Sequence, residues 1–130
     1  MQIGTFGQVW LVSRTSKSTN KPTAYALKVQ SKYELCQDGQ AAAVVYEKNI
    51  MAKLQHPFLI SLVGSYQDDH CVYMVMELVQ GGELYSVMSA APQRCLPESQ
   101  ARFYAAVIAE GLGFMHRRGY VYRDLKPESK

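Results

Sequence analysis

The chain has 130 residues, of which 48% are hydrophobic and 19% are charged, and its formal net charge is +3. This composition fits one domain with a buried core and excludes an acidic or low-complexity disordered chain. No cluster of Lys and Arg indicates a nucleic-acid surface, and no apolar run is long enough to span a bilayer. The three cysteines stand far apart, without a Cys-x-x-Cys pair, which favours a reducing compartment. We therefore expect an intracellular, cytoplasmic protein that binds neither nucleic acid nor a membrane.

Strands dominate the first half of the predicted structure and helices the second. In chain order, the periodicity and turn residues predict strands at about 6–14 and 24–30, a helix at 40–54, strands at 59–66 and 71–78, and helices at 83–89 and 97–118. This order indicates an α+β fold, with a small, mostly β lobe followed by the start of an α lobe. Between Phe103 and Met115 the long helix carries only one charged residue, Glu110. Such a helix needs cover on most sides, so we expect the chain to be truncated.

A short glycine-rich turn, Gly4-Thr5-Phe6-Gly7, precedes the first predicted strand. Dinucleotide-binding and P-loop motifs need a helix at this point, because the helix N-terminus meets the phosphate. A glycine loop that leads into a strand instead indicates a flap of backbone amides over a nucleotide. Taken alone, the turn also fits a plain hairpin near the end of a chain.

A lysine and a glutamate in separate elements form the second candidate site. Strand alternation places Lys28 on one face with Ala24 and Ala26, whose small side chains leave room for a flat ligand. Glu47 shares the inward stripe of the predicted helix with Ile50, and a carboxylate there is costly unless it is paired. We therefore predict an ion pair that holds the Lys28 ammonium ready for phosphate oxygens. The alternative is an amphipathic helix whose glutamate faces solvent.

The third candidate site follows the long helix. Asp124, Lys126 and Ser129 stand at spacings i, i+2 and i+5. A carboxylate, a cation and a polar group in this order could orient a hydroxyl, steady a γ-phosphate and hold a metal ion. An ordinary charged surface loop is the alternative.

The run Tyr122-Arg123-Asp124-Leu125-Lys126-Pro127-Glu128-Ser129 resembles the H-R-D-L-K-P-E-N catalytic loop of eukaryotic serine/threonine protein kinases. Its Tyr-Arg-Asp form is similar to the AGC group, above all to the cyclic-nucleotide-dependent kinases. The glycine turn, the Ala-Leu-Lys strand and the helical glutamate stand in the family order. The resemblance implies a protein-kinase-like fold, with residues 1–79 as an antiparallel β N-lobe that lacks its first strand. Residues 80–130 would be the hinge exit and the start of the α-helical C-lobe.

The resemblance also implies a role for each matching residue. The ATP contacts would be Gly4, Phe6 and Gly7 over the phosphates, Val9 and Ala26 against adenine, Lys28 paired with Glu47 at the α- and β-phosphates, Met76 as gatekeeper, Glu77 and Val79 at the adenine edge through their backbone, and Glu83 at the ribose. The remaining roles would be Asp124 as catalytic base, Lys126 at the γ-phosphate, Glu83 and Glu128 as readers of basic residues before the target Ser or Thr, and Ser129 at the metal position.

The implied function is phosphoryl transfer from ATP, with Mg²⁺, to serine or threonine of a protein substrate. Two departures bear on it: the hydroxyl of Ser129 is a poorer Mg²⁺ ligand than the usual Asn amide, and the 130 residues contain neither Asp-Phe-Gly nor Ala-Pro-Glu. We therefore expect an incomplete catalytic domain that is inactive as given, or the product of an incomplete gene model. The alternative function is a kinase-like binding module, or pseudokinase, that acts without catalysis.

Overall fold

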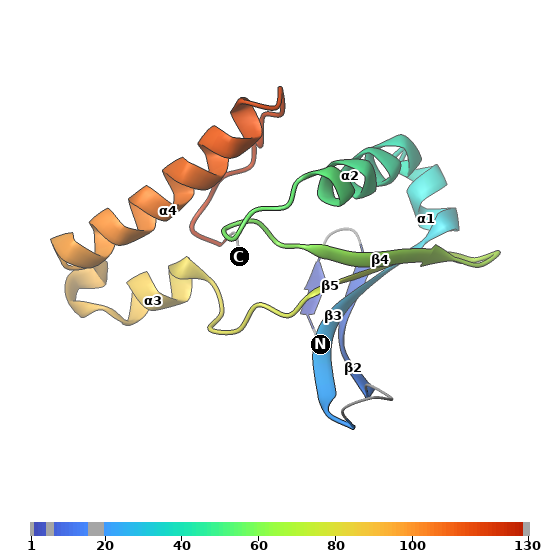
Figure 1. Cartoon of the computed structure of the whole chain (residues 1–130), viewed down its shortest axis with the longest axis horizontal. Helices are drawn as coiled ribbons and strands as arrows, with labels where there is room; N and C mark the ends of the chain where they lie inside the picture. The colour runs from blue at the N-terminus through green and yellow to red at the C-terminus, as the bar shows by residue number, and fades with distance from the viewer. Residues whose placement is uncertain (1, 5–6, 16–19, 129–130) are drawn as a thin grey trace. The chain divides into compact units, whose positions relative to one another are not determined.

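The computed structural model describes residues 2–4, 7–15 and 20–128 (Figure 1). The strands are β1 (Gln2–Gly4), β2 (Gly7–Thr15), β3 (Pro22–Ser31), β4 (Leu62–Gln67) and β5 (Cys71–Glu77). The helices are α1 (Lys32–Gln37), α2 (Ala41–Lys53), α3 (Leu84–Ala90), the 3₁₀ turn η1 (Pro92–Arg94) and α4 (Glu98–His116). Strands with one main helix, followed by helices alone, confirm the predicted α+β order. No helix in the described ranges combines the length and apolarity needed to cross a membrane.

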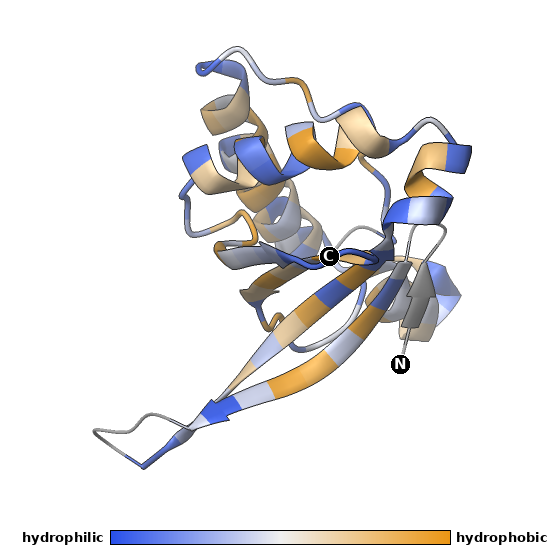
Figure 2. Cartoon of the chain, turned by 90° about the vertical axis from the view of Figure 1, so that its right-hand side faces the viewer, coloured by the Kyte–Doolittle hydropathy of each residue, from blue (hydrophilic) through white to orange (hydrophobic). Residues whose placement is uncertain are grey.

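The strands form one antiparallel sheet in the order β1-β2-β3-β5-β4. Hydrophobic and hydrophilic residues alternate along the long β2–β3 hairpin (Figure 2), as expected for a sheet with two different faces. Directly paired residues of antiparallel strands point to the same face. The register therefore decides which side chains gather on each side of the sheet.

The chain forms two compact units. Unit 1 comprises residues 1–55 and 60–78, and unit 2 comprises residues 56–59 and 79–130. In unit 1, α2 lies along one face of the sheet and contacts β4 (Figure 1). The buried apolar residues of this unit come from both layers and from the end of α2: Leu35, Val44, Leu54 and Met74.

Several elements differ from the prediction. Where the sequence predicted no strand, β1 pairs with β2 over the register Gln2↔Val9 to Gly4↔Gly7. Helix α1 was not predicted, and the side chain of Ser31 caps it by accepting a hydrogen bond from the Glu34 amide at 3.4 Å. Strand β4 begins later than predicted, because the chain first turns over residues 57–59.

An exposed turn joins β4 to β5 and is organised by Asp68. Its carboxylate accepts hydrogen bonds from the Tyr73 hydroxyl at 2.7 Å and from the backbone amides of His70 at 2.8 Å and Cys71 at 2.7 Å. The Tyr73 hydroxyl, followed by the two amides, lowers the pKa of Asp68 to about 2. The same bond to Asp68 raises the pKa of Tyr73 to about 12. Each shift reflects a hydrogen bond made in one protonation state only.

Unit 2 is built on α4, whose core-facing residues include the buried Gly111 and Met115. The helix α3 is tied to the segment after α4 by a hydrogen bond from the Tyr85 amide to the Pro127 carbonyl at 2.8 Å. Most of the large apolar side chains of α4 are at least half covered, whereas Phe103 is 64% exposed.

Candidate functional site

One face of three adjacent strands collects the residues expected to contact a nucleotide. Val9 of β2 pairs with Lys28 of β3, and Ala26 of β3 pairs with Met76 of β5. Because these positions alternate by two along each strand, all four side chains belong to the same face. Leu11 pairs with Ala26 on this face and is 72% exposed, so an apolar surface is open there to a flat ligand.

Lys28 and Glu47 form the predicted ion pair. The Lys28 Nζ donates to both carboxylate oxygens of Glu47, at 2.9 and 3.0 Å, across 19 positions of sequence. The side chains are 21% and 42% exposed, so solvent weakens the attraction and the pair adds little to stability by itself. Its effect is geometric: it fixes an ammonium group beside the apolar face, where phosphate oxygens could reach it.

The glycine turn is visible in part. Gly4 and Gly7 pair with each other at the end of the β1–β2 ladder. Gly7 has φ 131°, and a Cβ added there would lie 2.5 Å from the Val29 carbonyl oxygen, so this position demands glycine. The third residue expected at the phosphates, Phe6, lies outside the described residues.

The adenine-edge residues come from the end of β5 and the segment that follows. The Glu77 amide donates to the Ser61 carbonyl at 3.0 Å, so this amide is not available to bind a ligand. Val79 belongs to unit 2 and is exposed.

The predicted catalytic loop follows α4 in unit 2. Lys126 Nζ contacts both oxygens of the Asp124 carboxylate, at 3.2 and 3.1 Å, and both side chains are more than half exposed. Arg123 has φ 61°, which is uncommon for a residue other than glycine and often marks a functional segment. A carboxylate and an ammonium at this distance could act on neighbouring atoms of one reacting group.

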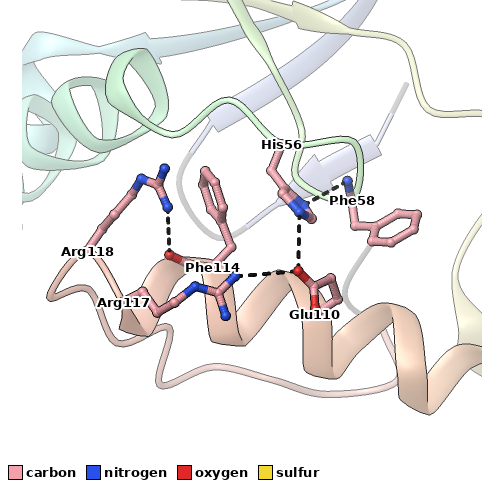
Figure 3. A network of polar contacts seen from close by, with 6 residues as sticks. All are labelled: His56, Phe58, Glu110, Phe114, Arg117 and Arg118. Atoms are coloured by element: carbon pink, nitrogen blue, oxygen red, sulfur yellow. Dashed lines mark hydrogen bonds and ion pairs between the residues drawn. The ribbon is translucent and has the colours of Figure 1, made fainter.

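A polar cluster attaches the loop of residues 56–59 to α4 (Figure 3). His56 Nδ1 accepts a hydrogen bond from the Phe58 amide at 3.3 Å, and its Nε2 lies 3.9 Å from the Glu110 carboxylate. Arg117 reaches the same Glu110 oxygen at 3.4 Å. Because Nδ1 accepts, Nε2 carries the proton of the neutral ring and faces the carboxylate.

An aromatic stack completes this cluster at the C-terminal end of α4. The Phe114 ring lies 4.5 Å from the His56 ring and 3.6 Å from the Arg118 guanidinium carbon (Figure 3). The stack holds the last turn of α4, and the Tyr120 amide donates back to the Met115 carbonyl at 3.1 Å. These contacts fix the end of α4, and the segment that contains Asp124 starts from there.

Of the remaining predicted site residues, Glu83 and Glu128 lie within the described ranges and Ser129 does not. Glu83 stands at the N-cap position of α3 without a side-chain capping bond, and Glu128 follows Pro127. The Tyr85–Pro127 hydrogen bond therefore lies between their two segments. Ser129, the predicted metal ligand, lies outside the described residues. Within the described ranges, no three His, Cys, Asp or Glu side chains form a group that could hold a metal ion.

Sequence reasoning missed three residues on the sheet face that carries Lys28. Leu11, Met74 and Gln30 share this face with Lys28, and Met74 and Gln30 are both buried. The period of two that identified Lys28 also reaches Gln30, two residues further on. That signal could have included Gln30, but its burial depends on α1 and α2.

Comparison with known proteins identifies the class. The protein kinase domain family matches residues 2–129, and the chain belongs to this family. The chain is 38% identical over 126 residues to the serine/threonine-protein kinase nrc-2 of Neurospora crassa, and 38% identical to the cAMP-dependent protein kinase catalytic subunit of Arthrobotrys oligospora. Both matches cover 97% of this chain. The second relative is an AGC-type kinase, in agreement with the predicted group.

The fold agrees with a solved kinase structure. Rad53 (residues 1–466) in complex with AMP-PNP matches 98% of this chain and 32% of its own chain, with a TM-score of 0.83 and 30% identity. The chain spans 20% of the nrc-2 kinase and 23% of the Arthrobotrys enzyme. The shared segment is therefore a minor part of those relatives.

Proposed function

We propose that this chain is part of an ATP-dependent serine/threonine protein kinase, with residues 1–79 in its N-lobe and residues 80–130 beginning its C-lobe. The observation that carries the proposal is the Lys28–Glu47 ion pair beside an apolar face that includes Val9, Ala26 and Met76. A flat base fits the apolar face, while the fixed ammonium suits phosphate oxygens. Because Gly7 has no side chain, the backbone at the start of β2 could approach the phosphate oxygens closely.

The proposed reaction moves the γ-phosphoryl group of ATP to a protein hydroxyl. The substrate oxygen bonds to the γ-phosphorus, the bond from phosphorus to the β,γ-bridging oxygen breaks, and the hydroxyl proton passes to the Asp124 carboxylate. Lys126, at 3.1 Å from that carboxylate, would neutralise charge on the transferred group. Mg²⁺ enters the proposal only as the ion that accompanies ATP in solution.

We further propose that the protein substrate carries basic residues before its serine or threonine. Two carboxylates support this preference, because Glu83 and Glu128 flank the backbone hydrogen bond that joins α3 to the loop. Guanidinium groups bind carboxylates through paired hydrogen bonds. A cytoplasmic location is part of the same proposal, supported by three cysteines that are all free thiols.

The test is transfer of radiolabelled phosphate from ATP to a basic serine peptide by the intact gene product. Asp124→Asn should lower kcat by about 10²-fold or more, because the proton acceptor is lost. Lys28→Met should lower kcat/KM for ATP by a similar factor, whereas Lys21→Met, at an exposed lysine of the same sheet region, should not. Equal activity of the wild type and Asp124→Asn would contradict the proposal.

The second candidate is a kinase-like binding module. Ser129 favours it, because a serine stands where the family motif has its metal-binding Asn. Such a module would bind ATP, with affinity lost in Lys28→Met, yet would transfer no phosphate. Isothermal titration with ATP beside the radiolabel assay separates the two functions.

A further inference from the structure

Gln30, near the end of β3, is the most deeply buried polar side chain of unit 1. It is 2% exposed, and among the described residues its Oε1 has no hydrogen-bond partner. A buried acceptor without a partner is costly, and natural proteins satisfy nearly all such groups with protein or ordered water. The position of Gln30 therefore calls for a donor that the neighbouring side chains do not provide.

A small cavity adjoins this side chain. It has a volume of about 90 Å³ and lies wholly within unit 1, between β3 and the helices α1 and α2. Its polar lining comes from Lys28, Gln30, Gln40 and Glu47, and its apolar lining includes Leu35 and Val44. The buried acceptor and the ion pair therefore share one space.

The polar groups and the size of the cavity restrict which ligand it can hold. The ligand must donate to Gln30 Oε1, must be small, and must tolerate an ammonium and a carboxylate within the same cavity. A cavity of about 10–15 Å³ is enough for one water molecule, which also needs two to four polar partners. The four polar residues can supply these partners. Two of the three Lys28 ammonium protons serve Glu47, and the third is available to a water oxygen.

We propose that this cavity binds ordered water, which joins Gln30 Oε1 to the Lys28–Glu47 pair, and that Gln30 is a positioning residue for that pair. Gln30 is also set beneath the glycine turn, because a Cβ on Gly7 would lie 2.8 Å from its Cγ. One side chain thus supports the start of β2 and, through water, the orientation of the Lys28 ammonium. The positioning role rests on the proposed function, whereas the water site does not.

The direct test is a crystal structure of the intact gene product at a resolution that shows ordered water. We expect a water peak about 2.7–3.2 Å from Gln30 Oε1 and within hydrogen-bond distance of at least one of Lys28, Gln40 and Glu47. A site without ordered water beside Oε1 would overturn the proposal. This readout is independent of ATP and of catalysis.

The positioning role is tested by Gln30→Met, which keeps the length of the side chain and removes the acceptor. We expect ATP affinity to fall about twofold to tenfold, the equivalent of one hydrogen bond, while the melting temperature does not rise. Gln67→Met, at an exposed glutamine of β4, is the matched control and should leave both values unchanged. A higher melting temperature with unchanged ATP affinity would show that Oε1 is truly unsatisfied and that Gln30 positions nothing.

Discussion

Replacement of Phe114 by alanine should lower the free energy of unfolding by about 3 kcal/mol. A fully buried Phe→Ala change costs about 3–5 kcal/mol, and the half-buried Phe114 should lose roughly half of that. The ring also contacts the His56 ring at 4.5 Å and the Arg118 guanidinium at 3.6 Å. Each of these contacts adds about 0.5–1 kcal/mol. Urea unfolding of the intact gene product, followed by circular dichroism, measures the sum.

Two consecutive arginines provide the control. Arg118 lies over the Phe114 ring, whereas Arg117 reaches the Glu110 carboxylate instead. A double-mutant cycle should therefore give a coupling of about 0.5–1 kcal/mol between Phe114→Leu and Arg118→Met, and near zero with Arg117→Met. A cost below about 1 kcal/mol for Phe114→Ala, or equal coupling to both arginines, would refute this account of the stack.

Other outcomes follow from single positions. Gly111→Ala should raise the free energy of unfolding by about 1 kcal/mol in the same urea experiment, because glycine is unfavourable inside a helix. The new Cβ would meet Leu59 at 3.6 Å, which is an ordinary contact distance. A loss of stability would mean that the loop of residues 56–59 lies closer to α4 than this distance. Tyr73→Phe should raise the pKa of Asp68 from about 2 toward its ordinary 3.8 in a carboxyl-carbon NMR titration. Because the folded-state pKa of Asp68 is depressed, its contribution to stability is present above pH 3.8 and is lost as pH falls toward 2. The variant keeps the two backbone amide bonds to Asp68, so its acid-dependent loss should be smaller than that of the wild type. The Tyr73 pKa is raised to about 12, so its contribution is complete below pH 10 and lost as pH rises from 10 to 12; alkaline melting curves of wild type and variant should therefore converge.

The ion pair could be predicted from the sequence because it depends only on the strand period of two and the helix period of 3.6. Alternation along β3 fixed the face of Lys28, and spacing along α2 fixed the inward side of Glu47. The pair could be predicted without knowing how far apart the elements lie, because a buried-side carboxylate needs a cation. Its observed distances of 2.9 and 3.0 Å confirm that argument.

Local signals were also present where the prediction failed. The Ser31-x-x-Glu34 spacing is that of a helix cap, and it could have revealed α1, which has only six residues. The attachment of His56 to Glu110 and Phe114 could not be read from the sequence, because it joins a loop to a helix more than 50 positions away. The water cavity likewise needs the packing of three elements before it exists.

The loop of residues 56–59 has a consequence for dividing this protein into pieces. It is inserted between two parts of unit 1, yet it belongs to unit 2 and packs on α4. A cut after Leu78 would leave Phe58 and Leu59 on one fragment and their helical partner on the other. The fragment 1–78 would keep all of unit 1, whereas the fragment 79–130 would lack residues 56–59 of its own unit. The second fragment should therefore be poorly soluble alone and should bind the first when the two are coexpressed, as the halves of a split protein do.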